Sequence, residues 1–156
     1  MPRYLSLLAL LIAAPLAFSQ APADHLTRAQ LLQQAAALEA PATAGSGSAS
    51  AKLATYPHHF TMVALRQRNG QAERHDRYAD LFVVLKGTAT ILTGGTISDL
   101  HETAPGEFLG SAVLGGTSAT VRPGDVFHIP AGLPHQVLLA PHSHFVYYVV
   151  KIEEKP

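Results

Sequence analysis

Beyond residue 50 the chain alternates short apolar runs with turn-forming residues. Stretches rich in Val, Leu, Ile, Phe, Tyr and Thr are separated by Gly, Pro and Asn, which is typical of strands joined by turns. No segment in this region has helical periodicity, and several short strands at such spacing predict an all-β sandwich or barrel. The expected strands are Phe60–Arg68, Leu81–Lys86, Thr88–Leu92, Thr117–Arg122, Val126–Ile129, Gln136–Leu139 and Phe145–Ile152.

The segment 26–39 has a different pattern. Leu31, Ala35 and Leu38 recur at helical spacing, and Thr27 can begin a capping box. We therefore expect a short N-terminal helix with one apolar face.

Residues 1–19 have the layout of a secretory signal peptide. A basic Arg3 precedes the apolar run Leu5–Leu16, and small residues follow, which predicts cleavage after Ser19. The alternative is a membrane anchor, but the run is shorter than the about 20 residues of a comfortable span. The sequence thus predicts a periplasmic or secreted protein.

Small residues dominate the segment 41–50, PATAGSGSAS, which predicts a flexible linker. The expected organisation is therefore a signal peptide over 1–19, a short helix and linker over 20–50, and one folded domain over 51–156.

Composition narrows the chemistry. The chain has no cysteine, which excludes disulfides, thiolate nucleophiles and cysteine-rich zinc sites. Eleven Lys and Arg balance eleven Asp and Glu without a basic patch, so we expect neither a nucleic-acid partner nor a membrane partner for the mature form. Nine histidines direct attention to metal binding, since imidazole is the commonest metal ligand.

The string GDVFHIPAGLPH has the spacing G-x5-P-x-G-x2-H, filled by Gly124, Pro130, Gly132 and His135. Its first glycine begins a turn, a short strand follows, and the Pro-Ala-Gly segment forces a reversal. The reversal places His135 at the start of the returning strand.

A second group lies upstream. Glu73 and His75 are two residues apart, so on a strand they point to the same face. Asp80 begins the next apolar strand and can lie beside them. If both strings line one barrel, these three side chains converge with His135, and such a set suits a divalent Mn, Fe, Ni or Zn ion.

The string ending at His135 resembles the second conserved motif of the cupin superfamily. The first motif of that family reads H-x-H, three or four residues, E, six residues, G. It is similar to this chain with Glu73 and His75 at the two histidines, Asp80 at the glutamate and Gly87 at the glycine. The resemblance covers about residues 55–152 and implies a single jelly-roll-like cupin β-barrel.

This chain departs from the three histidines and one glutamate that the resemblance implies. Glu73 stands where a histidine is usual, and Asp80 is one methylene shorter than glutamate. Glu73 is then a fourth ligand, a general base or a bystander, and His75, Asp80 and His135 alone would form a facial triad. Loss of the metal, leaving a site for a small polar molecule, is the remaining alternative.

Other polar residues have two readings each. Arg66, Arg68 and Arg77 either lie at the barrel mouth, where they would hold an anionic group such as a carboxylate, or are solvated charges. His128 either lines the barrel or faces outward.

Three functional hypotheses follow. The first is a metal-dependent enzyme acting on a small polar molecule by Lewis-acid activation. The second is a non-catalytic periplasmic protein that binds a small ligand, with or without metal. The third is an interaction domain that pairs into a homodimer. The fold alone does not choose among them.

Overall fold

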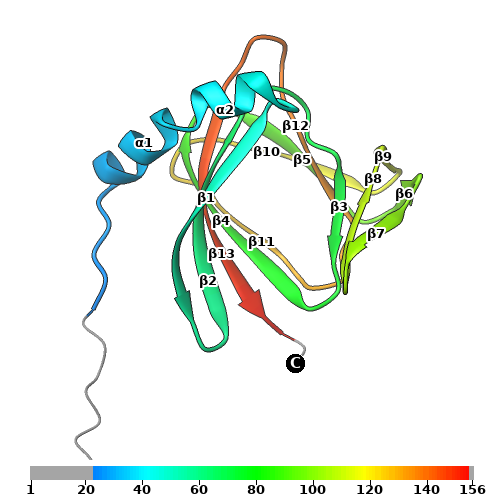
Figure 1. Cartoon of the computed structure of the whole chain (residues 1–156). Helices are drawn as coiled ribbons and strands as arrows, with labels where there is room; N and C mark the ends of the chain where they lie inside the picture. The colour runs from blue at the N-terminus through cyan, green and yellow to red at the C-terminus, as the bar shows by residue number, and fades with distance from the viewer. Residues whose placement is uncertain (1–22, 155–156) are drawn as a thin grey trace, which may run out of the picture.

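The computed structural model describes residues 23–154 (Figure 1). The expected signal peptide at 1–19 lies outside the described residues. The helices are α1 (Arg28–Ala36) and α2 (Glu39–Ala44). The strands are β1 (Ser48–Tyr56), β2 (His59–Arg66), β3 (Ala72–His75), β4 (Tyr78–Lys86), β5 (Ala89–Thr93), β6 (Thr96–Ser98), β7 (His101–Ala104), β8 (Glu107–Gly110), β9 (Ala112–Leu114), β10 (Thr117–Val121), β11 (Val126–Ile129), β12 (His135–Leu138) and β13 (Phe145–Glu153).

Two antiparallel sheets dominate the described part of the chain. The first sheet has the order β1-β2-β13-β4-β11, and the second has the order β10-β5-β12-β3-β8-β7. The two sheets face each other around a barrel, and β6 and β9 form a small ribbon beside β7 and β8 (Figure 1). The expectation of an all-β, jelly-roll-like barrel preceded by a short helix is therefore confirmed.

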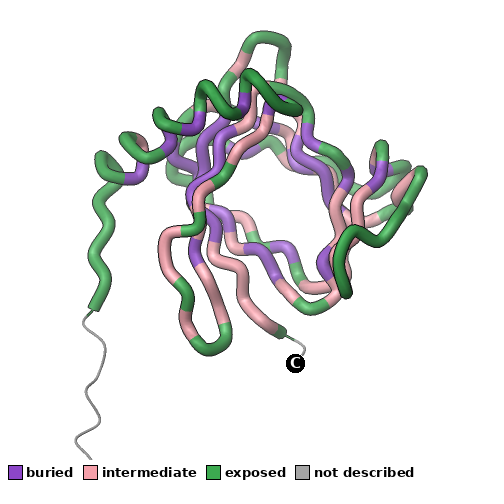
Figure 2. The backbone as a smooth tube through the Cα atoms, viewed as in Figure 1, coloured by how far each residue is buried: buried purple, intermediate pink, exposed green. Residues whose placement is uncertain are grey.

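The core lies inside the barrel because every second side chain of a strand points inward. Its largest members are at most 3% exposed, and Figure 2 shows buried positions all around the ring. Burying each of these side chains contributes about 1.5–3 kcal/mol. They are Phe82, Ile91, Ile129, Val137 and Phe145.

The two helices cover part of the outer face of the first sheet (Figure 1). Thr27 and Gln30 form the expected capping box, and Leu31 and Ala35 are buried against the sheet. The expected helix over 26–39 is divided, because α1 ends at Ala36 and α2 begins at Glu39. The helices and the outer face of the first sheet form a second hydrophobic core, which comprises Leu31, Ala35, Leu38, Ala42, Val63, Leu65, Leu85 and Val146.

The prediction of a flexible linker over 41–50 is wrong. Pro41 lies in the first turn of α2, where its missing N–H is not needed, and Ala42 is fully buried. The following residues form the start of β1, where Ser48 pairs with Arg66 of β2. Small side chains were taken as a sign of disorder, but here they let the chain pack closely and form the edge strand of the first sheet.

The seven strands predicted from apolar runs correspond to β2, β4, β5, β10, β11, β12 and β13, with shifted ends. The strands β1, β3 and β6–β9 were not in the expected set, because they are either short or rich in Ser, Thr, Ala and charged residues and so lack a long apolar run. None of the helices in residues 23–154 combines the length and apolar character needed to cross a bilayer.

Candidate metal centre

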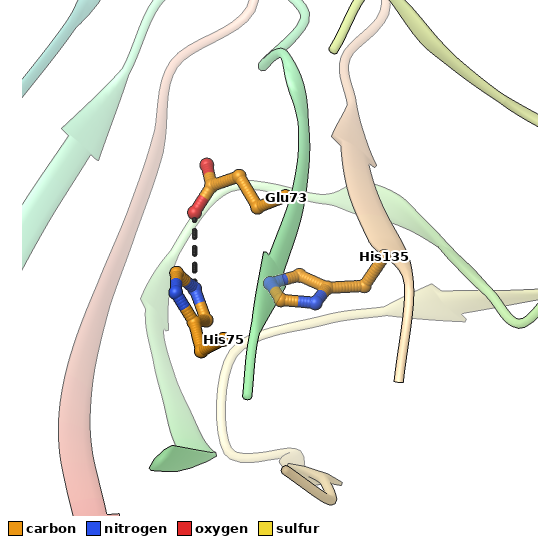
Figure 3. A group of neighbouring side chains, drawn as sticks. All are labelled: Glu73, His75 and His135. Carbon is orange, nitrogen blue, oxygen red and sulfur yellow. Dashed lines mark ion pairs between the residues drawn. The ribbon is translucent and has the colours of Figure 1, made fainter. Parts of the chain in front are cut away.

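Strand pairing brings the two sequence motifs together inside the barrel. Glu73 and His75 point inward from β3, and His135 begins the neighbouring strand β12 directly opposite Glu73. Figure 3 shows these three side chains directed toward a common space. The second motif also contacts the first through its backbone, since the N–H of Gly132 donates to the carbonyl of His75 at 2.8 Å.

The fourth expected residue, Asp80, reaches the same space from β4 in the other sheet. Its Oδ2 lies 3.7 Å from Nε2 of His75 and 3.6 Å from Nε2 of His135. Oε2 of Glu73 lies 3.4 Å from Nε2 of His75. The ligand atoms of Glu73, His75 and His135 all lie within 4.8 Å of one another. Atoms bound about 2.1 Å from one ion are separated by about 3–4 Å, so these spacings suit a shared cation.

The two imidazoles supply the clearest test of whether a metal fits. Nε2 of His75 and Nε2 of His135 are buried and have no hydrogen-bond partner among the described residues. An unpartnered buried polar atom costs about 1–3 kcal/mol. A cation between the two nitrogens would remove both penalties at once, so the residues present fit a metal ion.

The opposite nitrogen of each ring is occupied. Nδ1 of His75 contacts the carboxylate of Glu107, and Nδ1 of His135 lies 3.1 Å from the carbonyl of Leu133. Each contact holds the Nδ1 proton and leaves a lone pair on Nε2, which is how metal-binding histidines are oriented in proteins.

Each of the two carboxylates, Glu73 and Asp80, has one oxygen bound by a cationic side chain. Oε1 of Glu73 accepts from Nη2 of Arg66 at 2.7 Å, and Nε of Arg66 donates to the hydroxyl of Tyr147 at 2.9 Å. Oδ1 of Asp80 forms an ion pair with Nζ of Lys151, its cross-strand neighbour on β13. In each carboxylate one oxygen binds a partly buried cation, and the other faces the histidines.

The surroundings shift the pKa values of Glu73, His75 and His135 in different directions. Burial raises the pKa of the Glu73 carboxyl, but its contact with His75 and the charge of Arg66 outweigh this effect, so the pKa of Glu73 is far below its usual range. Burial lowers the pKa of His75, but Glu73 and Asp80 together raise it above 6.5. For His135 burial prevails and its pKa is lowered. An always-ionised Glu73 is better suited to binding a cation than to accepting a proton.

The remaining polar residues take up clear positions. His128 faces outward, with Nε2 3.8 Å from Glu154. Arg77 also lies away from the site, where Nη2 binds Glu153 at 2.6 Å.

The sequence missed two contributors to the site and the ion pair made by a third. Glu107 and Lys151 were not considered, and Arg66 was foreseen only as a ligand-binding or solvated charge. Two inward residues of known strands, Arg66 and Lys151, could have been found from strand alternation. Glu107 lies in an unpredicted strand, and no signal marked it.

A cavity of about 400 Å³ opens above these residues inside the barrel. Glu73, Asp80, His135, Arg66 and Lys151 all line it. Apolar side chains form another part of its wall, and serines with Asn69 and Gln71 lie at its edge. The candidate centre is therefore accessible to a small molecule.

No model of a known protein family matches the chain, and no curated protein matches it. Solved structures do match it in their fold. The cupin domain of Cnp3 from Schizosaccharomyces pombe superposes with a TM-score of 0.52 at 12% identity, over 69% of this chain and 65% of that chain. The polyketide cyclase RemF from Streptomyces resistomycificus gives 0.50 at 17% identity, over 70% and 68%. Recombinant oxalate oxidase in complex with glycolate gives 0.50 at 19% identity, over 70% and 53%.

These likenesses concern the fold, and they establish that the chain has the cupin fold. The chain spans just under two thirds of the Cnp3 structure and about half of the oxalate oxidase structure.

Proposed function

We propose that this chain of cupin fold is an exported metal-binding protein that acts on a small polar molecule. The observation that carries the proposal is the pair of buried Nε2 atoms of His75 and His135, which have no hydrogen-bond partner among the described residues and lie 3.4–3.7 Å from carboxylate oxygens of Glu73 and Asp80. Two imidazoles and two carboxylates suit Mn, Fe, Ni or Zn.

Each residue has a defined part in this proposal. His75, His135 and Asp80 hold the ion, and Glu73 is the fourth ligand. The ion would supply Lewis-acid activation of a polar group on the bound molecule. His135 and Asp80 are at most 3% exposed, so the barrel wall shields these two side chains from bulk water.

Elemental analysis of the purified, exported protein tests this function. We expect about one equivalent of a transition metal per chain, and we expect His135→Ala to lose it because one of two imidazole ligands is gone. The matched control is His128→Ala, which removes an outward-facing histidine and should retain the metal. A protein that takes up no metal even on reconstitution, or a His135→Ala variant that binds as well as the parent, would refute the proposal.

Export is tested separately. The layout of residues 1–19 supports a cleaved signal peptide. We expect protein recovered from the periplasm or medium to begin at Gln20 by mass spectrometry. Recovery of the intact chain from the cytoplasm alone would contradict export.

A non-catalytic ligand-binding protein is the second candidate, and the state of Glu73 favours it. The ion pair with Arg66 leaves this carboxylate a weak proton acceptor, so the centre lacks an evident general base. Turnover of any small polar molecule that depends on added metal would exclude this candidate. Saturable binding without turnover would support it.

A further inference from the structure

Hydrogen-bond donors face the cavity in excess. Arg66 has five N–H groups, and its bonds within residues 23–154 use Nε and Nη2. Lys151 has three, and its partner in the same part of the chain is Asp80. The hydroxyl of Tyr147 accepts from Arg66, which leaves its own proton free to donate. We call Arg66, Tyr147 and Lys151 the donor cluster, and all three line the cavity.

Acceptors near the centre are already in use. Each carboxylate, Glu73 and Asp80, gives one oxygen to a cation of the donor cluster and turns the other toward the histidines. A molecule entering this space therefore meets N–H and O–H groups that need acceptors. A ligand rich in acceptors and poor in donors is the chemical complement.

The net charge of the surroundings indicates how much charge the ligand carries. Two cations, Arg66 and Lys151, stand against three carboxylates, Glu73, Asp80 and Glu107. With neutral imidazoles the sum is one negative charge, and a divalent ion changes it to one positive charge. A buried positive charge is costly unless it is neutralised, so a ligand with a single negative charge is favoured.

Part of the cavity lining is apolar. Phe82, Val137 and Val149 belong to it, and we call these three side chains the apolar wall. Part of the bound molecule can leave water against this wall, which contributes about 25 cal/mol for each Å² of apolar surface removed from water. A volume of about 400 Å³ admits only a small molecule.

We infer that the cavity binds a small organic monocarboxylate, whose carboxylate is recognised by the donor cluster and whose aliphatic or aromatic remainder lies against the apolar wall. This inference rests on the small-molecule role proposed above and names its ligand class. Because the ion supplies the positive charge, metal and carboxylate bind cooperatively, and each raises the affinity for the other by the same factor.

Calorimetry with isovalerate and its neutral isostere isovaleramide tests the inference on the full mature protein. Metal affinity is measured first, with Mn²⁺ alone. The manganese-loaded protein should then bind isovalerate at least about tenfold more tightly than isovaleramide, because hydrogen bonds to a charged group contribute about 1.5–3 kcal/mol. Malonate, with two charges, should bind less tightly than isovalerate.

Matched variants locate the carboxylate. Tyr147→Phe removes one donor without changing charge and should weaken isovalerate binding about tenfold. Tyr148→Phe, which alters the outward-facing neighbour, should leave it unchanged. Lys151→Gln should also weaken binding, whereas Lys52→Gln, whose ammonium lies over the Phe60 ring, should not.

The outcomes separate the two proposals. Uptake of Mn²⁺ with equal affinities for isovalerate and isovaleramide would overturn the carboxylate inference and leave the metal proposal standing. Failure to bind any metal would refute the proposed function, and the same pair of ligands would then be compared on the metal-free protein. Absence of a carboxylate preference there would overturn the inference as well.

Discussion

Glu107 provides a sharp test of the candidate centre, because it contacts His75 but is not one of the proposed metal ligands. Its carboxylate accepts from Nδ1 of His75 across the β3–β8 pair, where the two residues are in register. The Glu107→Gln variant keeps the size and an acceptor oxygen but removes the charge. The imidazole then becomes less basic and less firmly oriented.

The expected loss of metal affinity is about 10- to 100-fold, the usual effect of removing such an outer partner. That range equals about 1.4–2.7 kcal/mol. Stability of the metal-free protein should change little, because the Glu107 side chain is 36% exposed and no core contact is lost. Competition against a metal-binding dye measures the affinity, and urea denaturation of the metal-free protein measures stability.

Glu102→Gln is the matched control. Glu102 lies on the neighbouring strand β7, is exposed and bonds the N–H of Gly106 at 2.9 Å. Its replacement should leave metal affinity unchanged. If Glu107→Gln binds metal within threefold of the parent while the control also does, the Glu107–His75 contact does not orient a metal ligand, and the reasoning fails.

Three further predictions concern proton linkage and the fold. The pKa of His75 in the metal-free protein is raised above 6.5, so a metal must displace its proton below that pKa. The affinity for metal should therefore fall about tenfold for each pH unit below it. Calorimetry in buffers of different ionisation enthalpy measures the proton release. Phe145→Ala should cost about 3–5 kcal/mol in urea denaturation, since Phe145 is fully buried; a loss below about 1 kcal/mol would contradict the described core. Gly87 has a φ of +82°, and a Cβ there would lie 2.0 Å from the carbonyl oxygen of His144. Gly87→Ala should therefore lower the melting temperature, and an unchanged value would refute the turn geometry.

The site residues foretold by the two motifs do meet in the structure, for a reason visible in the chain. Period-two alternation places Glu73 and His75 on one face, and the Pro130–Gly132 reversal places His135 at the start of a strand. The spacing of the motifs does not predict the strand register that places His135 opposite Glu73, because that register depends on pairing between distant segments.

The contributors that the sequence did not reveal are those defined by tertiary contact. In the sequence, Lys151 is a single polar residue in an otherwise apolar strand. It becomes part of the site only because β13 pairs with β4 and places Lys151 beside Asp80. Glu107 reads as a turn residue after Pro105-Gly106. The apolar periodicity of residues 26–39 predicted the helix. The structure of residues 41–50 was not predicted, because small residues such as alanine can pack without producing an apolar pattern in the sequence.

The excursion between β5 and β10 contributes strands to the second sheet. Thr93 and Thr117 are paired neighbours, so residues 94–116 begin and end at almost the same point, and between these ends β8 pairs with β3. Both ends are Gly-Gly turns with positive φ, and a Cβ on Gly94 would lie 3.9 Å from Cα of Gly116. Within the excursion, β8 is the sheet neighbour of β3, the strand that carries Glu73 and His75. The four candidate ligand residues lie outside the excursion and Glu107 lies within it, so under the proposed function a changed excursion would alter the support of β3 and the metal affinity while leaving the ligand set intact.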